Sequence, residues 1–284
     1  LTSEPADLLA IPESAPSGLP VVTRLENPTR ALVERSTAPP YDPGAPRDAG
    51  TITVRAGESI QAAVDRALPG DIVLVEPGVY HETVYIDTAG ITVRGLVSAA
   101  GRSDFHRPWL DGPNQLSDGF NTTGNDFLLE GFGIRNYIGN GVLTTGAEKV
   151  VYRDLIIQNT GIYGLYPVEC TDVLIENVEA TGIADAAIYV GQSRGPIIVR
   201  HNTVFGNVTG IEIENSTNAE VYNNHVFDNT GGILVFLLPN NPSRVGYGTQ
   251  VYDNLVANNN HPNFAAANAI VGKVPPGTGI MIMT

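Results

Sequence analysis

The sequence repeats itself about every 23 residues, and this periodicity limits the folds that the chain can adopt. Each copy holds three short apolar runs with alternating polarity and no stretch at helical spacing. The five clearest copies begin at Gly141, Gly164, Ala187, Gly210 and Gly232. A unit of this length, with three strands and no helix, is typical of one coil of a parallel β-helix.

Alternation inside the first run of each copy predicts which side chains face the core. Successive side chains of a strand point to opposite faces. The predicted core column is Val142, Leu165, Ile188, Ile211 and Ile233. The neighbouring column, which we expect on the outer face, is Leu143, Tyr166, Tyr189, Glu212 and Leu234.

Two further columns collect asparagines. The first predicted column is Asp154, Asn177, Asn202, Asn224 and Asn254, and the second is Asn136, Asn159, Gly182, Asn207, Asn229 and Asn259. Asparagine tolerates left-handed turn conformations, and amides stacked at the ~4.8 Å strand spacing can bond to one another. We therefore interpret these columns as structural ladders.

The start of the chain differs from the repeats. Residues 1–50 hold nine prolines and read as an extended arm. An amphipathic helix is predicted over Ser59–Leu68, closed by Pro69 and Gly70, and would cover the apolar end of the stack. We expect the β-helix to span 51–284. The final GTGIMIMT reads as an unfinished coil, so either the native chain continues or another chain covers the open edge.

Composition narrows the functional classes. A formal net charge of −14 argues against nucleic acid, whose phosphates need a basic surface. It is compatible with neutral sugars, with basic partners or with a polyanion bridged by calcium, although solubility alone would explain it. Cys170 is the only cysteine, so no intrachain disulfide can form. No apolar run approaches the roughly 20 residues of a membrane-spanning helix.

Several segments are similar to known β-helix proteins. SIQAAVDRALPGDIVLVEPGVYHETVYI resembles the first segment of pectin-lyase-like right-handed β-helices. AIYVGQS, GIEIENSTNAEVYNNHVFDNTGGILVF and NNNHPNFA resemble a bacterial family named for its parallel β-helix repeats. This resemblance implies an exported all-β protein, a single-stranded right-handed parallel β-helix with an N-terminal α-helical cap and a proline-rich arm. It implies no activity, because the family's function is unassigned.

Motifs of the better-known relatives are absent. The sequence lacks the Gly-His-Gly and Arg-Ile-Lys motifs of polygalacturonases and the Asp-Pro-His-Asp motif of mannuronan epimerases. Fold alone does not fix function. Those two activities are therefore not expected.

The outer column carries the leading candidate site. Tyr166 and Tyr189 would form an aromatic strip on which sugars stack, and Glu212 would extend it. The alternative is a ladder that stabilises the sheet beneath the arm or a loop. Glu212 and Glu214 point the same way, with backbones about 6.6 Å apart. Inverting glycosidases hold their carboxyls about 6.5–9.5 Å apart, so these two are the candidate catalytic residues. A solvated acidic face, or a calcium site with Asn215, is the alternative.

A second column offers candidate substrate-binding residues. A lyase acting on a uronic acid needs a base and a cation to neutralise the substrate carboxylate. Arg153 and His201 could supply these groups, in a predicted column with Glu176, Asn223 and Asp253. The alternative is surface ion pairing, which contributes little per pair.

Cofactors are only weakly indicated. His225 and His261 lack a third ligand at a fixed spacing, so we assign no metal site to them. Calcium is the one ion that the acidic column would suit, and no cofactor is assigned with certainty.

Two functional hypotheses follow from the sequence. The first is an extracytoplasmic protein, periplasmic, cell-surface or secreted, that binds polysaccharide along its outer groove as a lyase, hydrolase or epimerase. Whether it is an enzyme is left open. The second is a non-enzymatic structural or assembly module that binds another envelope protein, or a second copy, through its face or its open C-terminal edge.

Overall fold

The computed structural model describes residues 49–98 and 106–283. These residues belong to one compact unit, Asp48–Thr284. The proline-rich arm predicted for residues 1–50 lies almost entirely outside the described residues. The division of the chain near residue 50 stays a prediction.

Three parallel sheets form the body of this unit. Sheet A has nine strands in the order β1 (Thr51–Val54), β2 (Ile72–Val75), β5 (Thr92–Gly95), β8 (Phe127–Glu130), β11 (Glu148–Arg153), β14 (Thr171–Glu176), β17 (Arg194–Arg200), β20 (Thr217–Tyr222) and β23 (Gln250–Tyr252). Sheet B has eight: β3 (Gly78–Tyr80), β6 (Pro108–Asp111), β9 (Gly133–Arg135), β12 (Ile156–Gln158), β15 (Glu179–Thr181), β18 (Thr203–Phe205), β21 (His225–Phe227) and β24 (Leu255–Ala257). Sheet C also has eight: β4 (Val84–Ile86), β7 (Phe120–Thr122), β10 (Val142–Thr145), β13 (Leu165–Val168), β16 (Ala186–Gly191), β19 (Thr209–Glu214), β22 (Gly231–Phe236) and β25 (Thr278–Met283).

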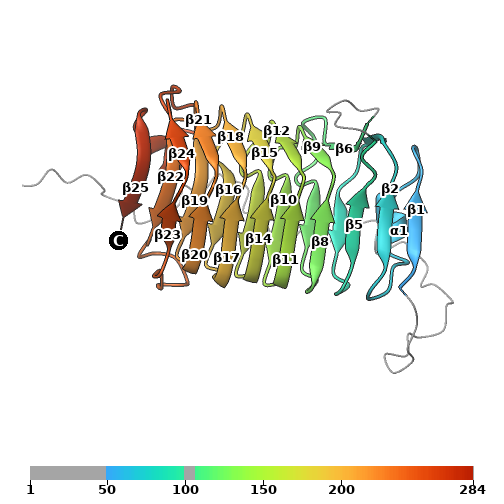
Figure 1. Cartoon of the computed structure of the whole chain (residues 1–284). Helices are drawn as coiled ribbons and strands as arrows, with labels where there is room; N and C mark the ends of the chain where they lie inside the picture. The colour runs from blue at the N-terminus through green and yellow to red at the C-terminus, as the bar shows by residue number, and fades with distance from the viewer. Residues whose placement is uncertain (1–48, 99–105, 284) are drawn as a thin grey trace, which may run out of the picture. The chain divides into compact units, whose positions relative to one another are not determined.

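Each strand pairs with the equivalent strands of the coils before and after it. Figure 1 shows the coils stacked from β1 at one end to β25 at the other. The result is a right-handed parallel β-solenoid of about eight turns, as the repeat predicts.

The predicted core column is confirmed. The five residues lie in register on β10, β13, β16, β19 and β22, and each is 0% exposed. Apolar β-branched side chains recur in the inward positions of the other sheets as well. One continuous core therefore fills the solenoid along its length.

The asparagine ladders form, although two predicted columns need correction. Amide side chains of Asn202, Asn224 and Asn254 bond in series at 2.9 Å, as do those of Asn207, Asn229 and Asn259. Asp154, Asn177, Asn136, Asn159 and Gly182 instead lie one position earlier, where φ is positive.

The physical reason is that two adjacent positions favour asparagine. One position needs a left-handed backbone, which asparagine tolerates, and the next needs an amide for the ladder. A column that matches asparagine to asparagine therefore combines two different backbone positions.

The copy with β17 also carries a register shift. Thr171 pairs with Arg194, whereas Val173 pairs with Ile197, so β17 holds an extra residue between these two pairs.

The predicted helix is present but shorter than expected. Helix α1 spans Ile60–Val64, and its N-cap Ser59 accepts a hydrogen bond from the Ala62 amide. Beyond Val64 the backbone continues with i to i+3 bonds, such as Ala67 to Val64, and these tighter turns end the α-helix. Apolar residues of α1 are buried beside β1, β2 and β4.

Two excursions interrupt the last coils. Residues 237–249 separate β22 from β23, and residues 258–277, with the 3₁₀ helix η1 (Ile270–Lys273), separate β24 from β25. An apolar cluster joins the second excursion to the outward side chains of sheet C: Val208, Leu234, Phe236, Leu238, Val271 and Val274. The outer face of sheet C is therefore covered at this end.

Candidate functional site

The predicted outer column of sheet C exists, and it gathers tyrosines. Leu143 pairs with Tyr166, and Tyr189 pairs with Glu212, which in turn pairs with Leu234. The rings of Tyr166 and Tyr189 lie edge to face with centroids 5.0 Å apart. The two tyrosines are therefore neighbours, as the alignment of the repeats indicates.

Tyr163 joins them from the corner before β13. Its ring stacks on Tyr189 at 4.5 Å and lies 4.6 Å from Tyr166. The Tyr163 amide donates to Asn140 Oδ1, and its carbonyl accepts from Thr160 Oγ1. Because corner residues have no strand periodicity, the repeat pattern carries no signal for Tyr163.

Three carboxyl groups lie against these rings. Glu212 and Glu214 come from β19, and Asp185 comes from the residue just before β16. Tyr189 Oη donates to Glu214 Oε1 at 2.8 Å. We call Tyr163, Tyr166, Tyr189, Asp185, Glu212 and Glu214 the carboxyl–tyrosine cluster.

The two glutamates point outward from the solenoid but are buried. Glu212 is 3% exposed and Glu214 is 7% exposed. The chain after β22 crosses Glu214, because Asn241 Nδ2 donates to Glu214 Oε1 and the Leu238 backbone bonds to the Asn215 side chain at 2.8 and 2.9 Å. The sequence predicts a solvent-exposed column of side chains, whereas Glu212 and Glu214 are covered by the chain that follows β22.

Burial and mutual repulsion keep protons on this cluster. The pKa of Glu212 lies well above its ordinary value because of burial, and then because of the charges of Asp185 and Glu214. Burial, followed by the charge of Glu214, raises the pKa of Asp185 to about 7. The pKa of Tyr189 is also raised, by burial and by Glu214. At neutral pH the cluster therefore holds carboxylic acid as well as carboxylate.

The charge of Glu214 contributes to the raised pKa of Glu212, after burial and the charge of Asp185. Strand spacing alone predicts carboxyls far enough apart for a water molecule, the arrangement of an inverting glycosidase. For Glu212 and Glu214 this arrangement stays a prediction. Asp185 is the third acid, and its Oδ1 atom is buried without a hydrogen-bond partner.

No metal centre accompanies these acids. In residues 49–98 and 106–283, no group of three or more His, Cys, Asp and Glu side chains is arranged to hold a metal ion.

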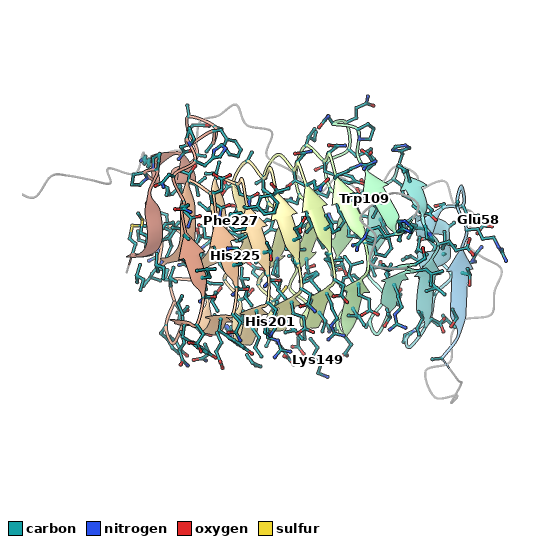
Figure 2. All side chains as sticks on the ribbon, turned by 45° about the horizontal axis from the view of Figure 1, so that its top comes forward. Glu58, Trp109, Lys149, His201, His225 and Phe227 are labelled. Carbon is teal, nitrogen blue, oxygen red and sulfur yellow. The ribbon has the colours of Figure 1, made fainter. Side chains whose placement is uncertain are left out.

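The predicted column of Arg153 and His201 needs correction. Arg153 pairs with Glu176 as expected, but Glu176 then pairs with Arg200, not with His201. Tyr222 and Tyr252 continue that column, whereas His201, Asn223 and Asp253 occupy the next position, where φ is positive. His201 is exposed at the turn after β17 (Figure 2). The predicted column matches Asn177 to Asn202, but the residue equivalent to Asn177 is His201, so Arg153 and His201 do not share a column.

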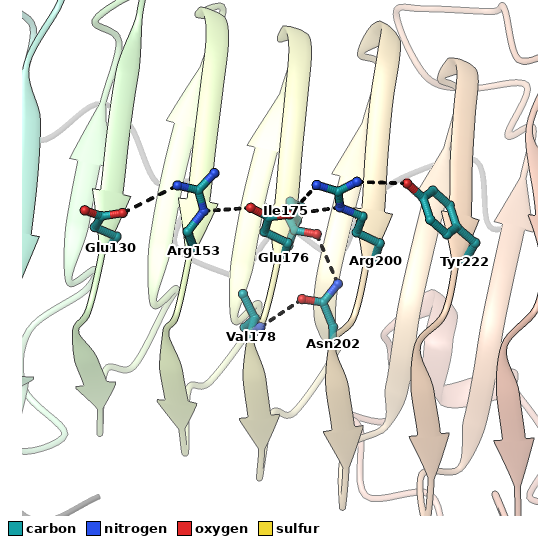
Figure 3. Close-up of polar contacts among 8 residues, drawn as sticks. All are labelled: Glu130, Arg153, Ile175, Glu176, Val178, Arg200, Asn202 and Tyr222. Atoms are coloured by element: carbon teal, nitrogen blue, oxygen red, sulfur yellow. Dashed lines mark hydrogen bonds and ion pairs between the residues drawn. The ribbon is translucent and has the colours of Figure 1, made fainter. Parts of the chain in front are cut away.

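Arg153 belongs to an alternating ion-pair ladder on the outer face of sheet A (Figure 3). Its Nε lies 2.6 Å from Glu176 Oε1, and its Nη1 lies 3.7 Å from Glu130 Oε2. Arg200 Nη2 lies 2.7 Å from Glu176 Oε2, and Arg94 pairs with Glu130. We call Arg94, Glu130, Arg153, Glu176 and Arg200 the ion-pair ladder. Because each arginine is engaged, the arrangement favours the ion-pairing alternative.

Residues 140–282, half of the chain, match the family model described as the right-handed beta helix region. The chain therefore belongs to the right-handed β-helix family. A search of curated proteins finds no match. No helix among the described residues is long and apolar enough to cross a membrane.

Several solved structures share this solenoid at low identity. The A-module of mannuronan C-5 epimerase AlgE4 from Azotobacter vinelandii is 15% identical, over 73% of this chain and 67% of that one, with a TM-score of 0.41. An alginate lyase from Paenibacillus sp. str. FPU-7 is 15% identical, over 83% and 98%, with a TM-score of 0.41. Pectate lyase Pel9A is 15% identical, over 78% and 80%, with a TM-score of 0.43. At TM-scores below 0.5, these likenesses say nothing about the chemistry of the cluster.

Proposed function

We propose that the protein is an exported, carbohydrate-active β-helix that binds polysaccharide at the carboxyl–tyrosine cluster. One observation carries this proposal: Asp185 and Glu212, whose pKa values are raised, lie with Glu214 beside three tyrosine rings on the outward side of sheet C. Strongly perturbed acids beside a specific partner are typical of functional sites.

Each part of the cluster has a distinct role in this proposal. The partly exposed rings of Tyr163 and Tyr166 stack against a sugar. Asp185, with a pKa of about 7, exchanges a proton with the glycosidic oxygen, since an acid is most effective when its pKa lies near the working pH. Burial and the charge of Glu214 keep that pKa high, and Glu212 and Glu214 contribute the second carboxyl.

Hydrolysis fits this arrangement better than elimination from a uronic acid. Elimination requires a cation beside the substrate carboxylate. The charged neighbours that shift the pKa values of Asp185, Glu212 and Tyr189 are carboxyl and tyrosine groups. A uronate chain would be repelled by them. The proposed substrate class is therefore a polysaccharide without carboxylates.

The test is a panel of uncharged and uronate polysaccharides, followed by reducing-end release, by absorbance of unsaturated products and by direct binding. We expect binding and hydrolysis of an uncharged chain. Asp185→Asn should slow hydrolysis at least about 100-fold while binding persists. Tyr166→Ala should weaken binding, and Glu148→Gln, an exposed acid on sheet A, serves as the charge-matched control. Failure to bind any polysaccharide, or full activity of Asp185→Asn, would contradict the proposal.

A second candidate function is a protein-binding module. Ile280 and Ile282 on β25 are 51% and 66% exposed, and Leu255 on β24 is 59% exposed. Exposed apolar side chains beside unpaired strand edges favour association. Sedimentation at increasing concentration is the test for self-association. Association that Ile282→Lys abolishes would favour this function, and a monomer at every concentration would count against it.

A further inference from the structure

We infer that the carbohydrate recognised at the carboxyl–tyrosine cluster carries free amino groups, as a deacetylated amino-sugar polymer does. This inference rests on the proposed function and names its substrate class. It starts from a contrast within the fold. Buried acids elsewhere in the described residues are satisfied by cations or by several donors, whereas Asp185 Oδ1 has no hydrogen-bond partner and Glu212 has only one long contact.

The compensated acids follow a consistent pattern. Asp111 pairs with Arg135 at 2.8 Å, and Glu176 pairs with two arginines. Asp118 Oδ1 accepts from the backbone and side-chain amides of Asn140 at 3.0 and 2.7 Å. Asp71 accepts from the Gly50 and Leu68 amides. A buried carboxylate is tolerated when a cation or several donors satisfy it.

The cluster departs from this pattern. No Lys, Arg or His among the described residues forms an ion pair with Asp185, Glu212 or Glu214. The Glu212 carboxyl receives only a long 3.5 Å contact from Thr209 Oγ1. Glu214 has Tyr189 and Asn241 as donors. Glu214 is therefore satisfied by donors, whereas Glu212 has neither a cation nor a short hydrogen bond.

Asp185 supplies an independent sign that a ligand group is missing. Its Oδ1 atom is buried and makes no hydrogen bond. Its charge raises the pKa values of Tyr163, Tyr166 and Glu212, and Asp185 directly precedes β16, the strand that carries Tyr189. An unpaired buried acceptor costs free energy unless a donor reaches it.

An ammonium group satisfies these requirements better than a hydroxyl. It brings three donors and a positive charge, and it can lie against a tyrosine ring. The protein's net charge of −14 also attracts a cationic polymer before contact. Because the amine replaces protons on the carboxyls, binding should release protons to the solvent.

The experiment is isothermal titration calorimetry of the whole protein at pH 6 with a glucosamine oligomer and with its N-acetylated counterpart of equal length. A sugar amine with a pKa near that of an α-amino group, about 7.7–8.0, is charged at this pH. Asp185 still holds its proton. We expect the amine form to bind about tenfold tighter or more. Titration in two buffers with different ionisation enthalpies should reveal proton release.

Variants tie the preference to the cluster. Asp185→Asn and Glu212→Gln should reduce the affinity for the glucosamine oligomer to that for the N-acetylated form. Glu148→Gln should leave the preference unchanged. Circular dichroism and thermal unfolding establish that each variant is folded.

The outcomes separate this inference from the proposed function. Equal or tighter binding of the N-acetylated oligomer would overturn the inference and leave polysaccharide binding standing. Binding of an oligolysine peptide as tight as that of the glucosamine oligomer would overturn it too, because the cluster would then recognise an amine without the sugar. If no polysaccharide of any charge binds, both proposals fail.

Discussion

The outer faces of sheets A and C use carboxyl groups in opposite ways. On sheet A, Glu176 lies between Arg153 and Arg200. Burial alone would raise the pKa of Glu176, but hydrogen bonds from the two arginines, and then their charges, lower it below its ordinary value. On sheet C, burial and neighbouring acids raise the pKa values of Asp185 and Glu212. In the same solenoid, the acids on the outer face of sheet A are paired with arginines, whereas those on sheet C have no ion-pair partner among the described residues.

The difference shows how to separate structural from functional polar residues in a solenoid. The ion-pair ladder and the asparagine ladders continue from coil to coil and satisfy their own members. The carboxyl–tyrosine cluster occupies only a few coils, and its groups come from strands and from the corners before them. A polar group that the repeat itself does not satisfy is the better candidate for ligand binding.

The largest expected effect is on the pH dependence of stability. Asp185 titrates at its ordinary value of 3.8 in the unfolded chain and at about 7 in the folded one. The folded state therefore binds more protons than the unfolded state between these two pH values. The stabilisation that Asp185 contributes is complete below about pH 4 and declines as pH rises to 7. In the wild type, the free energy of unfolding should fall by on the order of 2–4 kcal/mol across this pH range because of Asp185. Asp185→Asn should remove this fall, as measured by urea unfolding at several pH values. An unchanged pH profile in Asp185→Asn would break the comparison.

A smaller and opposite effect is expected on sheet A. The lowered pKa of Glu176 contributes stability that is present above its ordinary value of 4.5 and is lost as pH falls below it. Glu176→Gln should cost about 1–2 kcal/mol at neutral pH, because the arginines lose their shared acceptor. The difference from wild type should shrink at acid pH and in high salt. A cost that persists at low pH would indicate packing rather than charge.

The smallest effect concerns the end of the ion-pair ladder. Arg200 Nη1 donates to Tyr222 Oη at 3.2 Å, and the Tyr222 ring stacks on Tyr252 at 5.0 Å. Tyr222→Phe keeps the stack and removes the hydroxyl, so it should cost about 0.5–1 kcal/mol by chemical denaturation. A larger loss of unfolding free energy would mean that the Tyr222 hydroxyl stabilises sheet A through more than its hydrogen bond with Arg200.

The fold could be predicted from the sequence because every coil must bury the same inward positions and form the same turns. Inward positions such as Ile188 and Ile211 must be apolar in each copy, so their alternation is visible without a structure. Ladder amides such as Asn224 recur for the same reason. The short helix α1 was predicted too long because the apolar spacing continues through Leu68 while the backbone tightens into i to i+3 turns after Val64.

The candidate site was only partly predictable for a related reason. Tyr166, Tyr189 and Glu212 lie in a strand column, so alignment of the copies found them. Tyr163 and Asp185 lie at corners, where no periodicity marks them. Asn241 approaches Glu214 from an excursion that no repeat encodes. His201 falls in the wrong predicted column because asparagine is favoured at two adjacent positions, so matching Asn177 to Asn202 moves the column one residue too far.

The most direct test of the contrast between the two faces is a carbon-13 NMR titration of the side-chain carboxyl carbons, assigned with single Asp→Asn and Glu→Gln variants. We expect Asp185 to titrate near pH 7, Glu212 to stay protonated well above its ordinary pKa, and Glu176 to ionise below its own. Full ionisation of Asp185 and Glu212 by pH 5 would contradict the account, since the cluster would then be an ordinary solvated acidic face.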